Sequence, residues 1–187
     1  MGRAVTDGGR RLPVAGHTPA PAAFQRIAVV GLGAIGGSIA LAVRQTWPQA
    51  LVIGIDTHEV VEMAIRLHAI DVGSDDLALA GDADLVVLAA GAEENARALP
   101  YLADAVAGDA VVFAVGDSGP VADRATILPA RLPLVAGLPS VDLQGRGLVA
   151  ARTDLFEGRP WTVSAVTAGP GDAERVRELV RALGGAV

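Results

Sequence analysis

One stretch decides the fold of this chain: Arg26–Ser38, which reads RIAVVGLGAIGGS. The apolar run at residues 27–30 is typical of a buried strand, and apolar residues recur at helical spacing after it. Between them lie Gly31, Gly33 and Gly36, spaced as G-x-G-x-x-G. In this context the glycines allow a tight turn, a close backbone approach to a pyrophosphate, and close packing of helix on strand. The helix N-terminus adds partial positive charge, so the stretch predicts a dinucleotide site.

A second apolar strand pattern ends in an acidic residue. Leu51–Ile55 is followed by Asp56, which stands 20 residues after Gly36. A carboxylate at this place accepts hydrogen bonds from the adenine ribose hydroxyls and repels a 2′-phosphate. The sequence therefore predicts NAD as the cofactor and disfavours NADP.

The predicted cofactor contacts come from the glycine turn, the end of the second strand, and the end of a buried strand at Leu85–Ala90. They are Gly31, Leu32, Gly33, Ala34, Ile35, Gly36, Asp56, Ala89, Ala90 and Gly91.

Composition narrows the function classes. With 187 residues, 51% of them hydrophobic, and a mean hydropathy of +0.44, the chain is long and apolar enough to fold around a core. The net charge of −6 argues against nucleic acid or anionic membranes as partners. Without lysine or cysteine, there is no Schiff-base chemistry, thiol nucleophile or disulfide. No signal peptide or membrane span is expected, and the predicted location is the cytoplasm.

The patterning divides the chain into two parts. Residues 1–24 are rich in glycine and proline without periodicity, which predicts a flexible tail. In residues 25–187, strand and helix patterns alternate. The predicted fold class is therefore α/β, a Rossmann-like, doubly wound, mostly parallel sheet with helices on both faces. A helix is expected from Pro120 to about Ala130, and a loop from Gly137 onward.

Catalytic residues are harder to assign. The substrate end of the cofactor should face the ends of the fourth, fifth and sixth strands. No histidine follows His68, so the titratable groups of those loops are Glu93, Glu94, Asp117, Asp142 and Arg146. Each is a loop charge or helix cap as readily as a catalyst, and the catalytic residues stay unknown. The aspartates between residues 71 and 84 lack the spacing of metal ligands, so no metal is expected.

Residues 26–187 resemble the prephenate/arogenate dehydrogenase family. The resemblance is carried by VGLGAIGGSIALAVR at Val30–Arg44, VIGID at Val52–Asp56, ADLVVLAA at Ala83–Ala90, and AARTDLFEGRPWTVSA at Ala150–Ala165. It implies an NAD(P)-dependent oxidoreductase that decarboxylates a cyclohexadienol in tyrosine biosynthesis.

The sequence departs from that family on the substrate side. A family Asp-x-x-Ser-x-Lys stretch is matched by Ala114, Asp117 and Gly119, and Leu138 stands where the family has a histidine that bonds the substrate hydroxyl. Gly91 replaces the proline usual after the fourth strand. The family also continues into a helical domain, which supplies dimer contacts and an arginine for the substrate carboxylate, where this sequence ends. Two interpretations follow: an oxidoreductase acting on a small molecule, with a protein partner or as a homo-oligomer, or a non-catalytic dinucleotide-binding sensor or partner subunit.

Overall fold

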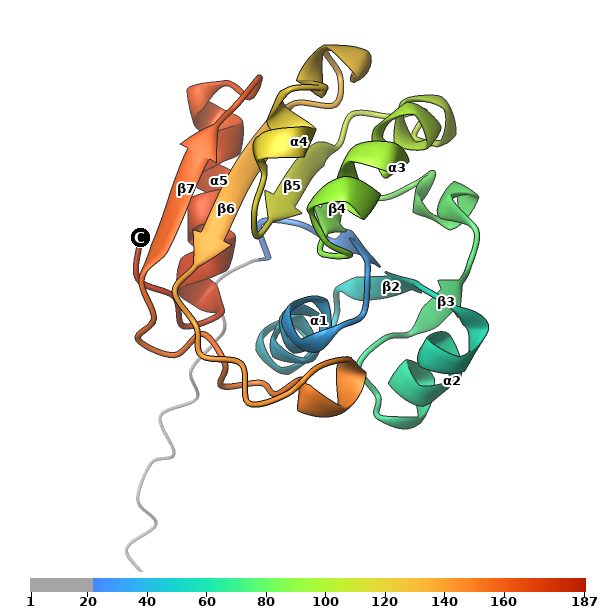
Figure 1. The fold of residues 1–187 in the computed structure, drawn as a ribbon, viewed down its shortest axis with the longest axis vertical. Coiled ribbons are helices and arrows are strands. Elements are labelled where there is room, and N and C mark those ends of the chain that lie inside the picture. The colour runs from blue at the N-terminus through green and yellow to red at the C-terminus, as the bar shows by residue number, and fades with distance from the viewer. Residues whose placement is uncertain (1–21) are drawn as a thin grey trace, which may run out of the picture.

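The computed structural model describes residues 22–187, so most of the predicted tail lies outside the described residues. Strands alternate with helices or short 3₁₀ turns along the chain (Figure 1). The strands are β1 (Arg26–Val30), β2 (Leu51–Ile55), β3 (Val72–Ser74), β4 (Leu85–Leu88), β5 (Val111–Val115), β6 (Leu134–Pro139) and β7 (Trp161–Ala165). The α-helices are α1 (Ala34–Thr46), α2 (His58–Arg66), α3 (Ala92–Ala105), α4 (Gly119–Ala122) and α5 (Pro170–Ala182). Short 3₁₀ turns are η1 (Leu77–Ala80), η2 (Ala125–Ile127) and η3 (Leu148–Ala150).

The strands form one sheet in the order β3-β2-β1-β4-β5-β6-β7. All neighbouring pairs are parallel except β6 and β7, which run antiparallel. The strand order reverses between β1 and β4, and such a switch point opens a crevice at the carboxyl ends of the two strands. The predicted α/β fold class, doubly wound and mostly parallel, is confirmed.

Two hydrophobic cores cover the two faces of the sheet. Ile27 and Val29 of β1 belong to one core, together with apolar residues of α1 and α5. Ala28 and Val30 belong to the other, together with apolar residues of α3. Because successive strand residues point to opposite faces, a continuously apolar β1 is what a strand covered on both faces requires.

The predicted alternation of strands and helices is wrong at the last strand. No α-helix separates β6 from β7; the connection contains only loop and η3. A parallel neighbour requires a crossover that returns to the starting edge, usually through a helix. Here the chain turns back at the carboxyl edge, and β7 is therefore antiparallel.

Two predicted boundaries were also wrong. The helix expected to reach Ala130 ends at Ala122, and the short turn η2 that follows it ends where Leu128 adopts an extended conformation ahead of Pro129. A residue that precedes proline is sterically biased away from the helical region. In addition, β6 continues through Pro139, so Gly137 and Leu138 lie in a strand instead of a loop.

The last residues of the predicted tail contact the folded domain. Phe24 is fully buried, and the Arg175 guanidinium lies 4.3 Å from the centre of its ring. Arg175 also donates to the Ala23 carbonyl oxygen at 3.1 Å. These contacts attach the segment before β1 to α5.

Within residues 22–187, no helix has the length and apolar character needed to cross a membrane.

Candidate functional site

The glycine turn lies at the switch point of the sheet. Gly31 has φ +88°, a conformation that favours glycine, and an added Cβ there would come 2.4 Å from the Ala90 backbone. An added Cβ on Gly36 would come 1.9 Å from the Gly31 carbonyl oxygen and 3.1 Å from the Ala89 Cβ. The structure thus brings together the predicted residues of the turn and those at the end of β4.

Gly33 differs from the other two glycines because it faces open space. An added Cβ would meet no atom within 4 Å. Gly33 is also the N-cap of α1, and no side chain caps this helix end. The first N–H groups of a helix have no partner within the helix, so those that follow Gly33, at Ala34, Ile35 and Gly36, are available to an anion. The first turn of α1 carries no acidic residue that would compete.

Asp56 closes the turn from the end of β2. Its Oδ2 accepts a hydrogen bond from the Leu32 N–H at 2.7 Å, and its Oδ1 accepts one from the Thr57 N–H at 2.7 Å. A carboxylate has about four acceptor sites, so about two remain for another ligand. Asp56 therefore holds the glycine turn and keeps capacity to accept hydrogen bonds from hydroxyl groups.

A pocket of about 350 Å³ extends from the turn towards α3. Its lining comes from the ends of β1, β2 and β4, the segment before η1, and one face of α3. The lining residues are Val30, Gly31, Ile55, Asp56, Asp75, Leu77, Ala90, Glu94, Arg97, Ala98 and Tyr101. The lining combines apolar side chains with a few charged and polar ones, which suits a flat, partly polar ring.

The α3 side of this pocket was not predicted from the sequence. Glu94, Arg97, Ala98 and Tyr101 follow the i, i+3, i+4, i+7 spacing of one helix face. Ala98 also belongs to the hydrophobic core beneath α3, so the pocket face and the core face of this helix overlap. The spacing groups these four residues on one helix face, and the tertiary structure places that face beside the turn.

Asn95 is a second residue that sequence reasoning did not single out as part of the site. Its side chain is 1% exposed, its Oδ1 accepts from the Ala90 N–H at 2.9 Å, and its Nδ2 donates to the Leu88 carbonyl oxygen at 3.2 Å. Gly91, with φ +117°, makes the turn between β4 and α3 that these bonds span. Asn95 thus fixes the backbone that contacts Gly31.

We expect Asn95→Leu to lower the free energy of unfolding by about 2 kcal/mol, since it leaves the Ala90 N–H without its side-chain partner and removes a donor to the Leu88 carbonyl oxygen. Urea denaturation of both proteins measures the change. Asn95→Asp keeps an acceptor for Ala90 but loses the donor to Leu88, and should lie between them. A Leu variant as stable as the wild type would show that the amide does not hold this turn.

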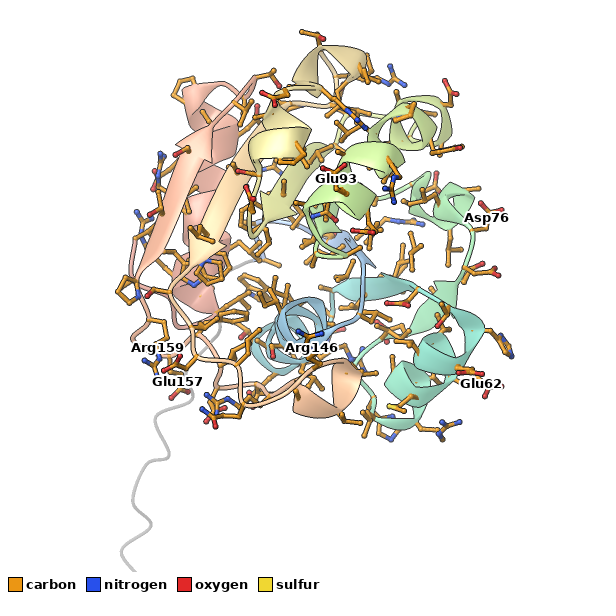
Figure 2. The ribbon with its side chains drawn as sticks, viewed as in Figure 1. Glu62, Asp76, Glu93, Arg146, Glu157 and Arg159 are labelled. Atoms are coloured by element: carbon orange, nitrogen blue, oxygen red, sulfur yellow. The ribbon has the colours of Figure 1, made fainter. Side chains whose placement is uncertain are left out.

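The substrate side of the sheet edge contains few polar groups with defined partners. Asp117 accepts from the Gly119 N–H at 3.1 Å, so its carboxylate shapes the turn after β5. Glu94 belongs to the pocket beside α3, away from the ends of β5 and β6, and Asp142 lies beside a separate cavity near η3. Figure 2 shows Glu93 on α3 and Arg146 drawn in front of α1. The structure does not gather these five residues into one catalytic cluster.

The segment after β6 is attached to α1. An added Cβ on Gly37 would come 2.5 Å from Leu148 and 2.9 Å from Ala151, so only glycine permits this packing. The buried Ser38 hydroxyl donates to the Ala34 carbonyl oxygen at 2.6 Å and accepts from the Arg152 N–H at 3.0 Å. This contact places the 148–152 segment against the first turns of the helix that begins at the glycine turn.

The aspartates between residues 71 and 84 have structural partners. Asp71 accepts from the Val52 N–H and pairs with Arg44, Asp76 accepts from the Ala78 N–H at the start of η1, and Asp84 accepts from the Gln25 and Arg26 N–H groups. Among residues 22–187, no three histidine, aspartate or glutamate side chains are grouped so as to hold a metal ion.

Comparison with known proteins identifies relatives. Residues 39–187 match the family "Prephenate dehydrogenase, nucleotide-binding domain". The match begins after the glycine turn, so the assignment of that turn as a dinucleotide site depends on its geometry alone.

Curated relatives carry the same name. Prephenate dehydrogenase of Bacillus subtilis is 35% identical over 70% of this chain and 37% of its own length. That of Lactococcus lactis is 26% identical over 86% of this chain and 45% of its own length. The chain thus spans less than half the length of these relatives.

Solved structures agree. Prephenate dehydrogenase from Aquifex aeolicus, in complex with hydroxyphenyl propionate and NAD⁺, matches with a TM-score of 0.79 and 25% identity, over 87% of this chain and 58% of that one.

Proposed function

Because the chain belongs to the family of prephenate dehydrogenase nucleotide-binding domains, we propose that it binds NAD at the glycine turn. The main support is the contact between Asp56 and the glycine turn. The Asp56 carboxylate accepts a hydrogen bond from the Leu32 N–H and can accept further hydrogen bonds beside the uncapped N-terminus of α1. The A. aeolicus relative in complex with NAD⁺ supports this choice of cofactor.

The residues present fit the cofactor group by group. Open space at Gly33 and the free N–H groups of the first α1 turn would hold the pyrophosphate. Asp56 would accept hydrogen bonds from the adenine ribose hydroxyls. The pocket beside α3 would take the adenine ring, and Ala89, Ala90 and Gly91 would pass beneath the rest of the molecule.

We further propose that the domain serves an oxidoreductase of the prephenate/arogenate dehydrogenase type acting on a small molecule. Bound NAD would supply the hydride acceptor. The chain's own residues would bind and orient it, with the ends of β4, β5 and β6 forming the floor of the substrate side. The remaining walls of that site would come from a further domain, a partner chain or a second copy, as the length of the relatives suggests.

A second candidate function is a non-catalytic dinucleotide-binding protein that acts as a sensor or partner subunit. It is favoured by Leu138, which lies near the end of β6 with 55% of its surface exposed and cannot transfer a proton. Loss of a general acid or base typically lowers a rate by about 10²- to 10⁴-fold.

Calorimetric titration with NAD tests the shared premise of both candidates. We expect saturable one-site binding by the wild-type chain, with weaker binding of NADP. If the chain binds neither NAD nor NADP, both candidate functions are refuted at once.

We expect Leu138→His to raise NADH formation from prephenate by about tenfold or more, since it introduces a proton acceptor at the sheet edge. The residue is exposed, so the replacement should leave the fold unchanged. Leu138→Asn, which adds polarity without a titratable group, is the matched control and should stay at the wild-type rate. If the histidine variant binds NAD and remains inactive, the non-catalytic candidate is favoured.

A further inference from the structure

The pocket beside α3 contains an ion pair that bears on the choice between NAD and NADP. We infer that Glu94 holds Arg97 away from a 2′-phosphate, so that Glu94 is a second determinant of cofactor specificity beside Asp56. This inference rests on the proposed NAD binding. Both Glu94 and Arg97 line the same pocket as Asp56. Glu94 is a positioning residue here, because it acts through Arg97.

Arg97 has the chemistry of a phosphate ligand. Its guanidinium can form two parallel hydrogen bonds to phosphate oxygens, and its long side chain can change rotamer because it is 67% exposed. It is the only cationic residue among those that line the pocket. Its side chain lines the same pocket in which Asp56 would hold the ribose.

In the structure, Glu94 forms an ion pair with Arg97. Its Oε1 lies 3.6 Å from Arg97 Nη1, one helical turn away. Within residues 22–187, Arg97 forms no other ion pair and no side-chain hydrogen bond. Removing the Glu94 charge would release Arg97 without breaking another ion pair or hydrogen bond of its side chain.

The charge of the pocket favours a ligand without the extra phosphate. Three carboxylates, from Asp56, Asp75 and Glu94, line the pocket together with one guanidinium. A 2′-phosphate carries additional negative charge, so it meets repulsion from Asp56 and competition from Glu94 for the arginine. An unphosphorylated ribose meets neither. The pair thus makes specificity depend on two acids on different elements, one at the end of β2 and one on α3.

The test measures dissociation constants for NAD and NADP by calorimetry. Glu94→Gln should tighten NADP binding by about threefold, the scale of one exposed ion pair, and should favour NADP relative to NAD. Asp56→Asn combined with Glu94→Gln should tighten NADP by about tenfold or more, because repulsion and competition are removed together. Adding Arg97→Gln to the single variant Glu94→Gln should return NADP affinity to the wild-type value.

Asp75→Asn is the matched control, because it removes one negative charge from the same pocket and Asp75 forms no ion pair with Arg97. It should change NADP binding less than Glu94→Gln does. Equal effects of the two variants, or a gain that survives Arg97→Gln, would overturn the inference while NAD binding stands. A wild-type chain that binds no NAD would remove the proposed function and this inference together. Thermal melts of the variants confirm that each is folded.

Discussion

Gly33→Ala is expected to weaken NAD binding by about thirtyfold while leaving the free energy of unfolding within about 1 kcal/mol of the wild type. The reason is where the new methyl group would point. At Gly33 it meets no protein atom within 4 Å, and the backbone φ of −73° suits alanine. The methyl group would instead fill the open space proposed for the pyrophosphate.

Gly36→Ala is the matched comparison, and its effect should be on the fold itself. Its methyl group would lie 1.9 Å from the Gly31 carbonyl oxygen, which is backbone and cannot rotate away. The start of α1 must shift, at a cost of about 2 to 3 kcal/mol. Urea denaturation and NAD titration of both variants separate the two effects. A Gly33 variant that binds NAD normally would show that no ligand approaches the backbone there.

Asp56→Ala is expected to weaken NAD binding by about a hundredfold. The variant removes the ribose acceptor and also the partner of the Leu32 N–H, which positions the glycine turn. Two charge-assisted hydrogen bonds at about 1.5 kcal/mol each account for this magnitude. Calorimetric titration with NAD measures the loss.

Asp56→Asn separates the two roles of the carboxylate. The amide oxygen can still accept from the Leu32 N–H, so the turn should persist, and NAD affinity should fall by about tenfold only. Glu59→Gln, which removes a charge from the first turn of α2 outside the pocket, is the control and should bind like the wild type. Undiminished NAD binding by Asp56→Ala would contradict the proposed site.

The sequence alone was sufficient for the fold class and for the two sides of the candidate site that meet at the switch point. Gly31 and Asp56 each end a strand with strong local signals, and the rules of parallel sheets bring such ends to one edge. The same reasoning failed after Ala122, where the helix expected to reach Ala130 has already ended. It also failed at β7, whose direction depends on how a long loop returns.

What the sequence determined, then, was everything encoded by local pattern: buried strands, the glycine turn, and the acid that follows β2. Only the tertiary structure decided which residues of α3 face the pocket, that Asn95 holds the β4–α3 turn, and that Ser38 and Gly37 attach the 148–152 segment to α1. The physical reason is distance along the chain. Ser38 and Arg152 are 114 residues apart, and a hydrogen bond between them exists only once the sheet has brought their elements together.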